Sequence, residues 1–294
     1  MSAALPLPAA LAAKVRQRFE RLQGRHALAF EVGGERFGVA EEVPYPAASV
    51  IKLPLMVLAL RAAERGELDL DERVVLRAEH HATGSGVLRD LDLGLAPTWR
   101  DLVRLMIVVS DNLATNLVLE RLGVSAVNVA LPSLGMPNSR VEGPLQVDGE
   151  RQTPRQRAGH AAATCAGDVL RLLLALDDGE LLGPEATAWA RATLVAQRYR
   201  EAIPRLIAGE APGANGLLVG SKGGWLSRAR HDAGLVWRDD GRRLVALVAL
   251  TADHPDTRSR IDHPATVATA RFARDLVDLA RARRGLTDQR TRTL

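Results

Sequence analysis

The stretch Ala47–Leu55, AASVIKLPL, places a serine and a lysine three residues apart at the expected start of a helix. Positions i and i+3 share one face of a helix, so the Ser49 hydroxyl and the Lys52 amine can meet. A serine hydroxyl becomes a good nucleophile when a neighbouring base removes its proton. The apolar run 53–60 that follows indicates a buried central helix. An ordinary helix start, with an N-cap serine and a surface lysine, is the alternative interpretation.

Lysine is rare in this chain. Of its 39 lysines and arginines, only Lys14, Lys52 and Lys222 are lysines. A lysine can act as a base when burial or nearby cations lower its pKa, whereas an arginine stays charged. The bias towards arginine therefore indicates that lysine stands where arginine would not serve.

The overall composition is typical of a folded globular protein. The chain has 294 residues, 47% of them hydrophobic and 25% charged, which suits one large domain or two closely packed subdomains. The net charge is +4, the arginines are scattered over the expected helices, and 3% of the residues are aromatic. Basic stripes and aromatic stacking platforms are the usual marks of nucleic-acid binding, so we expect no nucleic-acid partner.

The N-terminal segment does not have the pattern of an export signal. Residues 1–14 lack a basic start and carry two prolines in their short apolar part, which predicts the lead-in to a helix. No apolar run approaches the length of a membrane span, and the single cysteine, Cys165, permits no intramolecular disulfide. We expect a cytoplasmic monomer without a membrane span.

Strand patterns occur near the two ends of the chain. Residues 26–32 alternate, with Leu28 and Phe30 on one face, and Gly33-Gly34 predicts a hairpin to a strand over 36–39. Further strands are expected over 217–225, 233–237 and 242–251.

Helical patterns occupy the middle. Helices are expected over 8–23, 49–65, 98–109, 114–122, 126–134, 164–176, 184–197, 200–207 and 261–284. Between 136 and 163 the periodicity vanishes, and a polar loop of this length is usually functional. We therefore expect one α/β (α+β) domain, in which helices flank an antiparallel sheet built from the N- and C-terminal strands. An all-helical subdomain of residues 66–207 would be inserted into an α/β subdomain of residues 1–65 and 208–294.

Two further short motifs follow Ser49-x-x-Lys52 in the chain: Ser110-Asp111-Asn112 and Lys222-Gly223-Gly224. The three motifs in this order resemble the signature of class A β-lactamases and penicillin-binding proteins. The structural elements in which we expect the three motifs also match those of the family: a helix start, a junction of two helices and a strand end. The flanking sequences agree as well, namely YPAAS at 45–49, MIVVSDNLATN at 106–116 and RHDAG at 230–234. The resemblance covers residues 10–284.

The resemblance implies acyl transfer to Ser49. Ser49 would attack a strained or activated carbonyl, and Lys52 would accept its proton or orient a water that does. The backbone N–H groups of Ser49 and Trp225 would form the oxyanion hole, because Trp225 stands just past the third motif.

The same resemblance assigns roles in binding and proton transfer. Ser110 would pass a proton to the leaving nitrogen, and Lys222 would attract a substrate carboxylate and hold Ser110. Asn112 would bond a side-chain amide of the substrate, and Gly223 and Gly224 would complete the substrate-binding strand. Taken singly, Ser110-Asp111 can be a helix cap and Lys222 a surface charge.

The long loop departs from the family pattern. Class A enzymes use an acid in this Ω-loop, within R-x-E-x-x-L-N, to activate the water that cleaves the acyl-enzyme. That frame is absent. Counting back from Thr164, Glu150 falls nearest the expected position, and Glu142 and Asp148 are weaker candidates. Glu150 can equally be a solvated carboxylate, and Pro154 stands where the family has an asparagine.

The third motif also departs, because Gly223 replaces the usual threonine or serine. The missing hydroxyl removes one hydrogen bond to a substrate carboxylate, worth roughly 1.5–3 kcal/mol for a charged partner. Arg228 or Arg230 can compensate by gripping the carboxylate, or can be a surface arginine.

We therefore expect a serine hydrolase that opens small-molecule β-lactams through a Ser49 acyl-enzyme. Two alternatives stay open: an esterase or peptidase acting on another acyl compound, and a penicillin-binding protein that is acylated without efficient turnover. The paired histidines His80 and His81 have no metal ligands at suitable spacing, and a lysine base replaces a metal, so we expect no metal or other cofactor.

Overall fold

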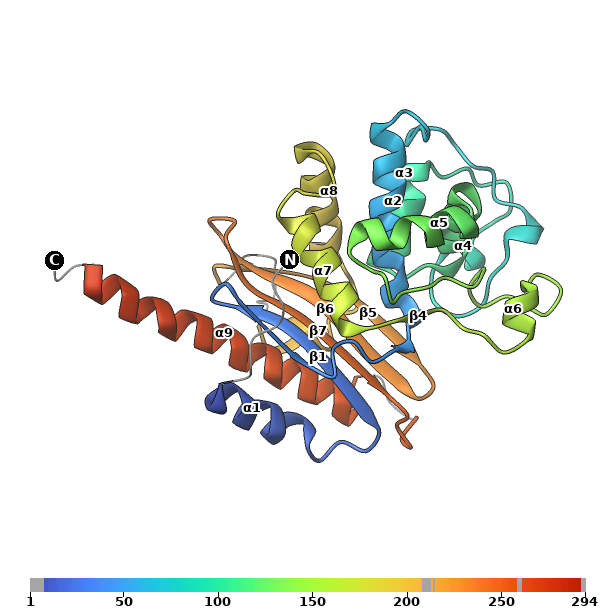
Figure 1. Cartoon of the computed structure of the whole chain (residues 1–294). Helices are drawn as coiled ribbons and strands as arrows, with labels where there is room; N and C mark the ends of the chain where they lie inside the picture. The colour runs from blue at the N-terminus through green and yellow to red at the C-terminus, as the bar shows by residue number, and fades with distance from the viewer. Residues whose placement is uncertain (1–7, 208–212, 214, 258–260, 292–294) are drawn as a thin grey trace.

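Five antiparallel strands form the central sheet (Figure 1). The computed structural model describes residues 8–207, 213, 215–257 and 261–291. The strands of the sheet are β1 (Arg25–Val32), β2 (Glu35–Val39), β5 (Leu217–Leu226), β6 (Ala229–Arg238) and β7 (Arg243–Ala252). Their order is β2-β1-β7-β6-β5, so β1 pairs directly with the last strand of the chain. The predicted antiparallel sheet built from both ends of the sequence is confirmed.

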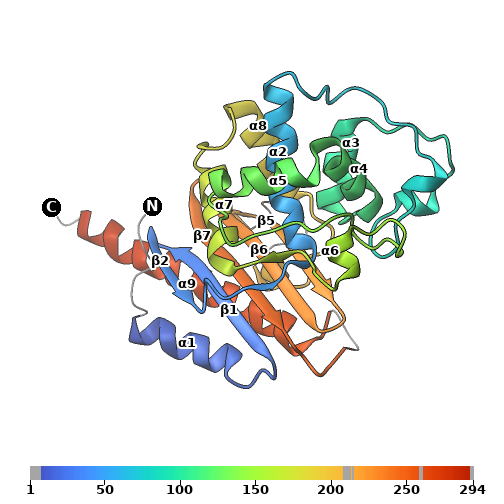
Figure 2. The ribbon, with the colours of Figure 1, turned by 45° about the vertical axis from the view of Figure 1, so that its right-hand side comes forward.

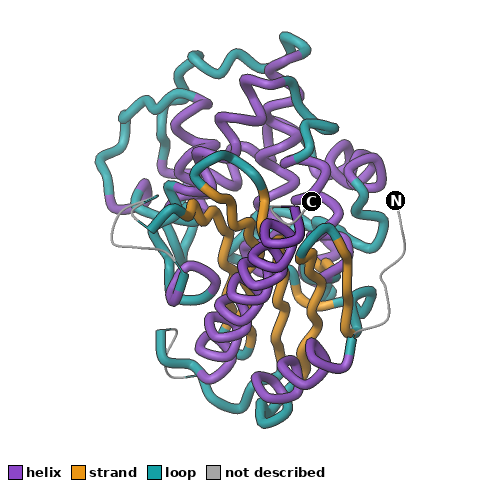
Figure 3. Tube along the Cα trace, turned by 90° about the vertical axis from the view of Figure 1, so that its left-hand side faces the viewer, coloured by secondary structure: helices purple, strands orange, loops and turns teal. Residues whose placement is uncertain are grey.

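Both faces of the sheet are buried. In β1, Leu28 and Phe30 pack in one hydrophobic cluster, while Ala27 and Ala29 pack in the other. This confirms the predicted alternation, because successive side chains of a strand point to opposite faces. Helices α1 (Ala9–Phe19) and α9 (Pro264–Thr291) cover the face with Leu28, and Figure 3 shows α9 crossing the strands.

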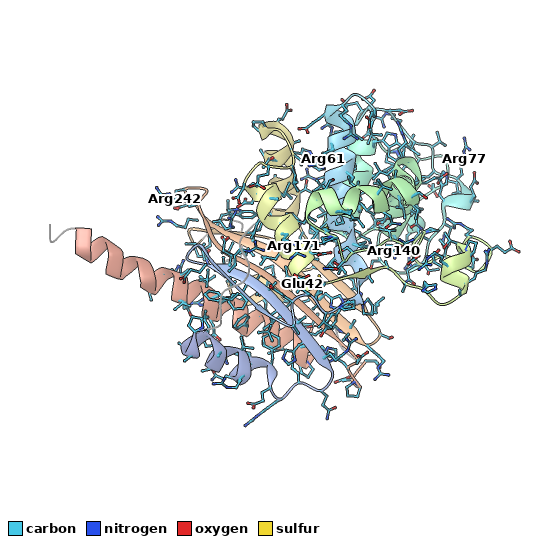
Figure 4. The ribbon with its side chains drawn as sticks, viewed as in Figure 1. Glu42, Arg61, Arg77, Arg140, Arg171 and Arg242 are labelled. Atoms are coloured by element: carbon cyan, nitrogen blue, oxygen red, sulfur yellow. The ribbon has the colours of Figure 1, made fainter. Side chains whose placement is uncertain are left out.

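The other face of the sheet carries α7 (Ala166–Asp177) along β1 and β7, and α8 (Pro184–Val195) against β5 (Figure 2). Glu42, in the segment after β2, and Arg171 of α7 lie beside one another (Figure 4), with Arg171 Nη1 2.7 Å from Glu42 Oε1. This ion pair holds the segment that leads to Ser49 against α7.

Helix α2 (Lys52–Glu64) is the central helix that the apolar run predicts, and it packs against α3, α4 and α8. The remaining helices are α3 (Trp99–Val108), α4 (Asn112–Leu122), α5 (Val124–Ala130) and the short α6 (Pro154–Arg157). Two-residue strands β3 (Tyr45–Pro46) and β4 (Ala163–Thr164) pair with each other beside the start of α2.

Two predicted helices differ from the structure. Over 200–207 there is only a 3₁₀ turn, η5 (Ile203–Leu206), because Pro204 has no N–H and the Ile203 N–H donates to Asp232 Oδ2 at 2.9 Å. The helix predicted over 126–134 begins at Val124 and ends at Ala130, before a 3₁₀ turn with Pro132 at its start.

Residues 1–7 and 208–212 lie outside the described residues, so the predicted N-terminal lead-in and the predicted boundary at 208 are not placed. Among the described helices, none taken singly has the length and apolar character needed to cross a membrane. Residues 112–122 and 124–134 together pass on length and composition, but they are bent by 80°.

Candidate active site

Ser49 lies in a 3₁₀ turn, η1 (Ala48–Ile51), that leads directly into α2. The preceding residue, Ala48, has a φ of 44°, a strained conformation for a residue with a side chain. Within the described part of the chain, neither the hydroxyl nor the backbone N–H of Ser49 makes a hydrogen bond. Both groups are therefore available to a ligand.

The Lys52 amine lies fully buried one helical turn after Ser49. Its Nζ donates to the Ser110 carbonyl oxygen and to Asn112 Oδ1, both at 2.7 Å, and lies 3.1 Å from Ser110 Oγ. Burial lowers the pKa of Lys52 well below its usual range, and the nearby charge of Lys222 lowers it further. These effects favour a neutral amine, which can accept a proton.

The Lys222 amine approaches the same serine from β5. Its Nζ donates to Ser110 Oγ at 3.1 Å and to the Gly223 carbonyl oxygen at 2.6 Å. Burial lowers the pKa of Lys222 to about 7, although the carboxylates of Asp232 and Glu201 oppose this shift. Ser110, whose φ is 55°, thus holds its hydroxyl between two buried amines.

The motif Ser110-Asp111-Asn112 contains both a helix cap and residues of the site. Asp111 caps α4 by accepting from the Ala114 N–H at 2.9 Å, as the capping interpretation predicts. Its other carboxylate oxygen accepts from two N–H groups of the loop at 87–88. Asn112 donates from Nδ2 to the Thr83 carbonyl oxygen at 2.8 Å, so the loop before α3 is fixed against the motif.

Ser49 opens into a cavity of about 660 Å³, which Asn112 and Trp225 also line. The opposite wall belongs to the long loop and carries Leu145 and four polar side chains: Gln146, Gln152, Gln156 and His160. Among the described residues that line this cavity, none is an aspartate, glutamate, lysine or arginine. Its walls are therefore almost entirely uncharged, and the two lysines lie buried behind them.

The structure does not bring the predicted acids of the long loop into this cavity. Glu150 and Asp148 are exposed, and neither lines the cavity. Glu142 is buried, but its carboxylate pairs with Arg140 and Arg155, at 3.0 Å and 2.6 Å, and these pairs lower its pKa. Of the loop residues that do line the cavity, Leu145 is held by α4: Asn116 exchanges two hydrogen bonds with its backbone, at 2.9 Å and 2.7 Å.

Arg230 is also outside the cavity that holds Ser49. It is buried, and its Nη1 donates to backbone carbonyl oxygens of the β5–β6 hairpin, including that of Ala229 at 2.8 Å. Arg228 donates to the His254 carbonyl oxygen at 3.0 Å. Both arginines are thus engaged with the backbone, and neither lines the cavity.

The end of β5 passes directly over the turn that carries Ser49. A Cβ at Gly224 would lie 2.9 Å from the Ser49 nitrogen and 3.2 Å from Ala48 Cβ, so only glycine fits without displacement. The next residue, Trp225, is half-buried, lines the cavity and packs edge-on against Tyr199 with ring centroids 5.0 Å apart.

Several cavity residues are absent from the sequence-based prediction. Ser85 lines the cavity between Gly84 and Gly86, and a Cβ at either glycine would meet the Asn112 or Asp111 side chain within 3.0 Å. Two glycines flanking a serine in a loop are a signal that could have been used. The three glutamines and His160 carry no such signal, because they lie scattered through a loop without periodicity.

The chain is similar to known proteins over most of its length. The family model described as the beta-lactamase enzyme family matches residues 11–280. The β-lactamase of Sphaerobacter thermophilus DSM 20745 is 30% identical, with a TM-score of 0.79, over 92% of this chain and 96% of that chain. PBP-A is 23% identical, with a TM-score of 0.79, over 95% and 98% of the two chains.

A β-lactamase from Xanthomonas campestris pv. campestris str. ATCC 33913 is 21% identical over 91% of this chain and 97% of that chain, with a TM-score of 0.77. At this identity and that of PBP-A, the likeness shows the fold alone. Among proteins with curated functions, none matches the sequence. The family model and the Sphaerobacter enzyme together show that the chain belongs to the beta-lactamase enzyme family, whose members are serine hydrolases of the β-lactamase and penicillin-binding-protein type.

Proposed function

We propose that this protein is acylated at Ser49 by β-lactams, in the manner of class A enzymes, and that it releases the acyl group slowly. Two observations carry the proposal: the Ser49 hydroxyl lines a cavity of about 660 Å³ and bonds to no other described residue, and two buried lysines share Ser110, one of them a helical turn after Ser49. A neutral serine needs an adjacent base, and these lysines are the buried amines that can supply one.

Acylation would proceed through Lys52. The neutral Lys52 amine accepts the Ser49 proton while Oγ bonds to the lactam carbonyl carbon. The resulting oxyanion is placed to accept from the N–H groups of Ser49 and Trp225. The carbon–nitrogen bond then breaks, and Ser110 donates its proton to the leaving nitrogen and recovers one from a neighbouring lysine amine.

Binding would use the second lysine and the second motif. Lys222, when protonated, attracts the carboxylate that β-lactams carry next to the ring nitrogen. Asn112 gives one Nδ2 hydrogen to Thr83, which leaves the other for an amide oxygen of the substrate. The uncharged carboxamides of the long loop suit the neutral side chain of such a substrate.

We expect slow release of the acyl group because of the residues that the long loop contributes to the cavity. Hydrolysis of an acyl-enzyme needs a base that activates water, and the described residues lining the cavity include no carboxylate for that task. This favours the penicillin-binding alternative over rapid lactam hydrolysis. A solved structure of a PBP-A mutant is an acyl-enzyme complex with penicillin G, so a protein of this fold can hold such an adduct.

The test is intact-mass spectrometry after mixing the protein with benzylpenicillin, with Ser49→Ala as the control. We expect an adduct on the wild type that persists while little product appears, and none on the variant. An adduct that decays quickly as product accumulates would show efficient turnover. If no adduct forms, the lactam assignment is wrong, and hydrolysis of a chromogenic ester without hydrolysis of nitrocefin would support an esterase.

A further inference from the structure

The Ser49 N–H is not used by its own turn, because Ser49 is only the second residue of η1. In a 3₁₀ turn each N–H donates to the carbonyl oxygen three residues earlier, so the first N–H groups have no partner inside the turn. The first such bond here joins the Val50 N–H to the Ala47 carbonyl oxygen at 3.2 Å. The Pro46 carbonyl oxygen, three residues before Ser49, is not an acceptor for the Ser49 N–H.

The Pro46 carbonyl oxygen is bound by His231 instead. His231 Nε2 lies 2.8 Å from it, and the Thr251 N–H donates to His231 Nδ1 at 3.1 Å. Because Nδ1 accepts, the ring hydrogen is on Nε2 and donates to Pro46. The ring is buried, and burial lowers its pKa to about 4, so it is neutral near pH 7.

His231 also lies at the place where the two halves of the oxyanion hole meet. It is paired across β5 and β6 with Gly224, so the two residues share one face of the sheet. A Cβ at Gly224 would lie 2.9 Å from the Ser49 nitrogen, and Trp225 follows Gly224 directly. One imidazole therefore joins the segment that leads to Ser49 to β6, the strand that pairs with Gly224 and Trp225 of β5.

We propose that His231 is a positioning residue of the oxyanion hole, which fixes the Ser49 N–H beneath β5 by holding the Pro46 carbonyl. The inference rests on the proposed acylation of Ser49. Without the imidazole donor, the segment that leads to Ser49 loses its bond to β6, and the Ser49 N–H shifts relative to the Trp225 N–H. A displaced donor stabilises the oxyanion less, and complete loss of one donor typically slows such reactions by about 10²–10³-fold.

Two substitutions separate the hydrogen bond to Pro46 from the bond to Thr251. In His231→Gln the side-chain amide nitrogen reaches the position of Nε2 and can still donate to Pro46. In His231→Asn the amide is one bond shorter, so it can accept from Thr251 but falls short of Pro46. Each variant therefore keeps one of the two contacts of His231, and only His231→Asn loses the contact with Pro46 that the inference invokes.

The experiment measures acylation by benzylpenicillin over a range of concentrations, which yields a limiting rate constant and a half-saturating concentration. We expect His231→Asn to lower the rate constant about 10–100-fold, with the half-saturating concentration within about twofold of the wild type, and His231→Gln to recover most of the rate. Melting temperatures show whether each variant is folded at the temperature of the assay.

The outcomes of this experiment distinguish a failure of the inference from a failure of the proposed function. If the wild type is acylated and His231→Asn reacts as fast, the inference is wrong. If both variants lose the rate and their melting temperatures fall alike, His231 only maintains the fold, which also overturns it. If the wild type forms no adduct, the proposed function itself fails, and the inference fails with it.

Discussion

The two walls of the cavity differ in the chemistry they offer. The wall built by α2, α4 and β5 holds Ser49 and two buried amines that share the Ser110 hydroxyl, each at 3.1 Å. The wall built by the long loop offers amides, one imidazole and Leu145. Forming an acyl bond needs the first set of groups, and breaking it with water needs a base on the second. The difference supports the proposed acylation with slow release.

The largest expected effect comes from removing the base of the first wall. Lys52→Met keeps the length of the buried side chain and removes its amine, so the Ser49 proton has no acceptor. We expect the acylation rate by benzylpenicillin to fall by about 10³-fold, measured by intact mass. Lys14→Met is the matched control, because Lys14 is paired with Asp275 on α9 and should leave the rate unchanged. Equal rates in all three proteins would remove Lys52 from the mechanism.

A smaller loss is expected where β5 covers the nucleophile. Gly224→Ala puts a methyl group 2.9 Å from the Ser49 nitrogen, where it blocks the oxyanion hole. We expect acylation to slow by about 10²-fold. In Gly223→Ala the nearest atoms lie at 3.8 Å, an ordinary contact, so this control should stay within about threefold of the wild type. The prediction fails if the two variants react alike.

Adding a carboxylate to the second wall would sharpen the comparison. Leu145 lines the cavity and Asn116 fixes its backbone, so Leu145→Glu places an acid in the cavity that Ser49 lines. We expect the acyl adduct to decay about tenfold faster, followed as loss of adduct mass after excess benzylpenicillin is removed. Glu150→Gln should not change the adduct lifetime, because Glu150 is exposed and outside the cavity. A longer lifetime in Glu150→Gln would instead assign the base to Glu150.

The smallest expected effect is a change of the half-saturating benzylpenicillin concentration with pH. The pKa of Lys222 is lowered to about 7, so this amine loses its charge as the pH rises through that value. A β-lactam carboxylate stays ionised throughout, and its attraction to Lys222 weakens. We expect the half-saturating benzylpenicillin concentration to rise roughly tenfold between pH 6 and pH 8.5. An uncharged ester should show no such rise, and a flat profile for both compounds would mean that Lys222 does not bind the carboxylate.

Regular elements were predictable because their signals are local. Alternation identified β1, and the apolar run identified α2. The helix predicted over 98–109 does start at the N-cap residue Thr98, whose Oγ1 accepts from the Asp101 N–H at 3.1 Å. The convergence of Lys52 and Lys222 on Ser110 was predictable only through the order of the motifs, since the residues lie far apart in the chain.

The long loop was not predictable by counting residues. Position along an irregular segment says little about position in space, and here side chains of other elements decide it: Asn116 of α4 holds Leu145, and Arg155 and Arg140 hold Glu142. Arg230 shows the same limit. Its type suits a carboxylate, but its place inside the β5–β6 hairpin directs it to backbone carbonyls.

The strand order has a consequence for how the protein becomes active. Residues 25–32 pair with residues 245–252, so the sheet closes only after nearly the whole chain has been synthesised. Pairings between such distant segments form slowly, because the intervening chain must first be brought together. The turn with Ser49 and the strand with Gly224 belong to the two parts that this closure joins. Reactivity of Ser49 is therefore a reporter of completed folding, and it should return during refolding with the last pairing of the sheet rather than with the helices.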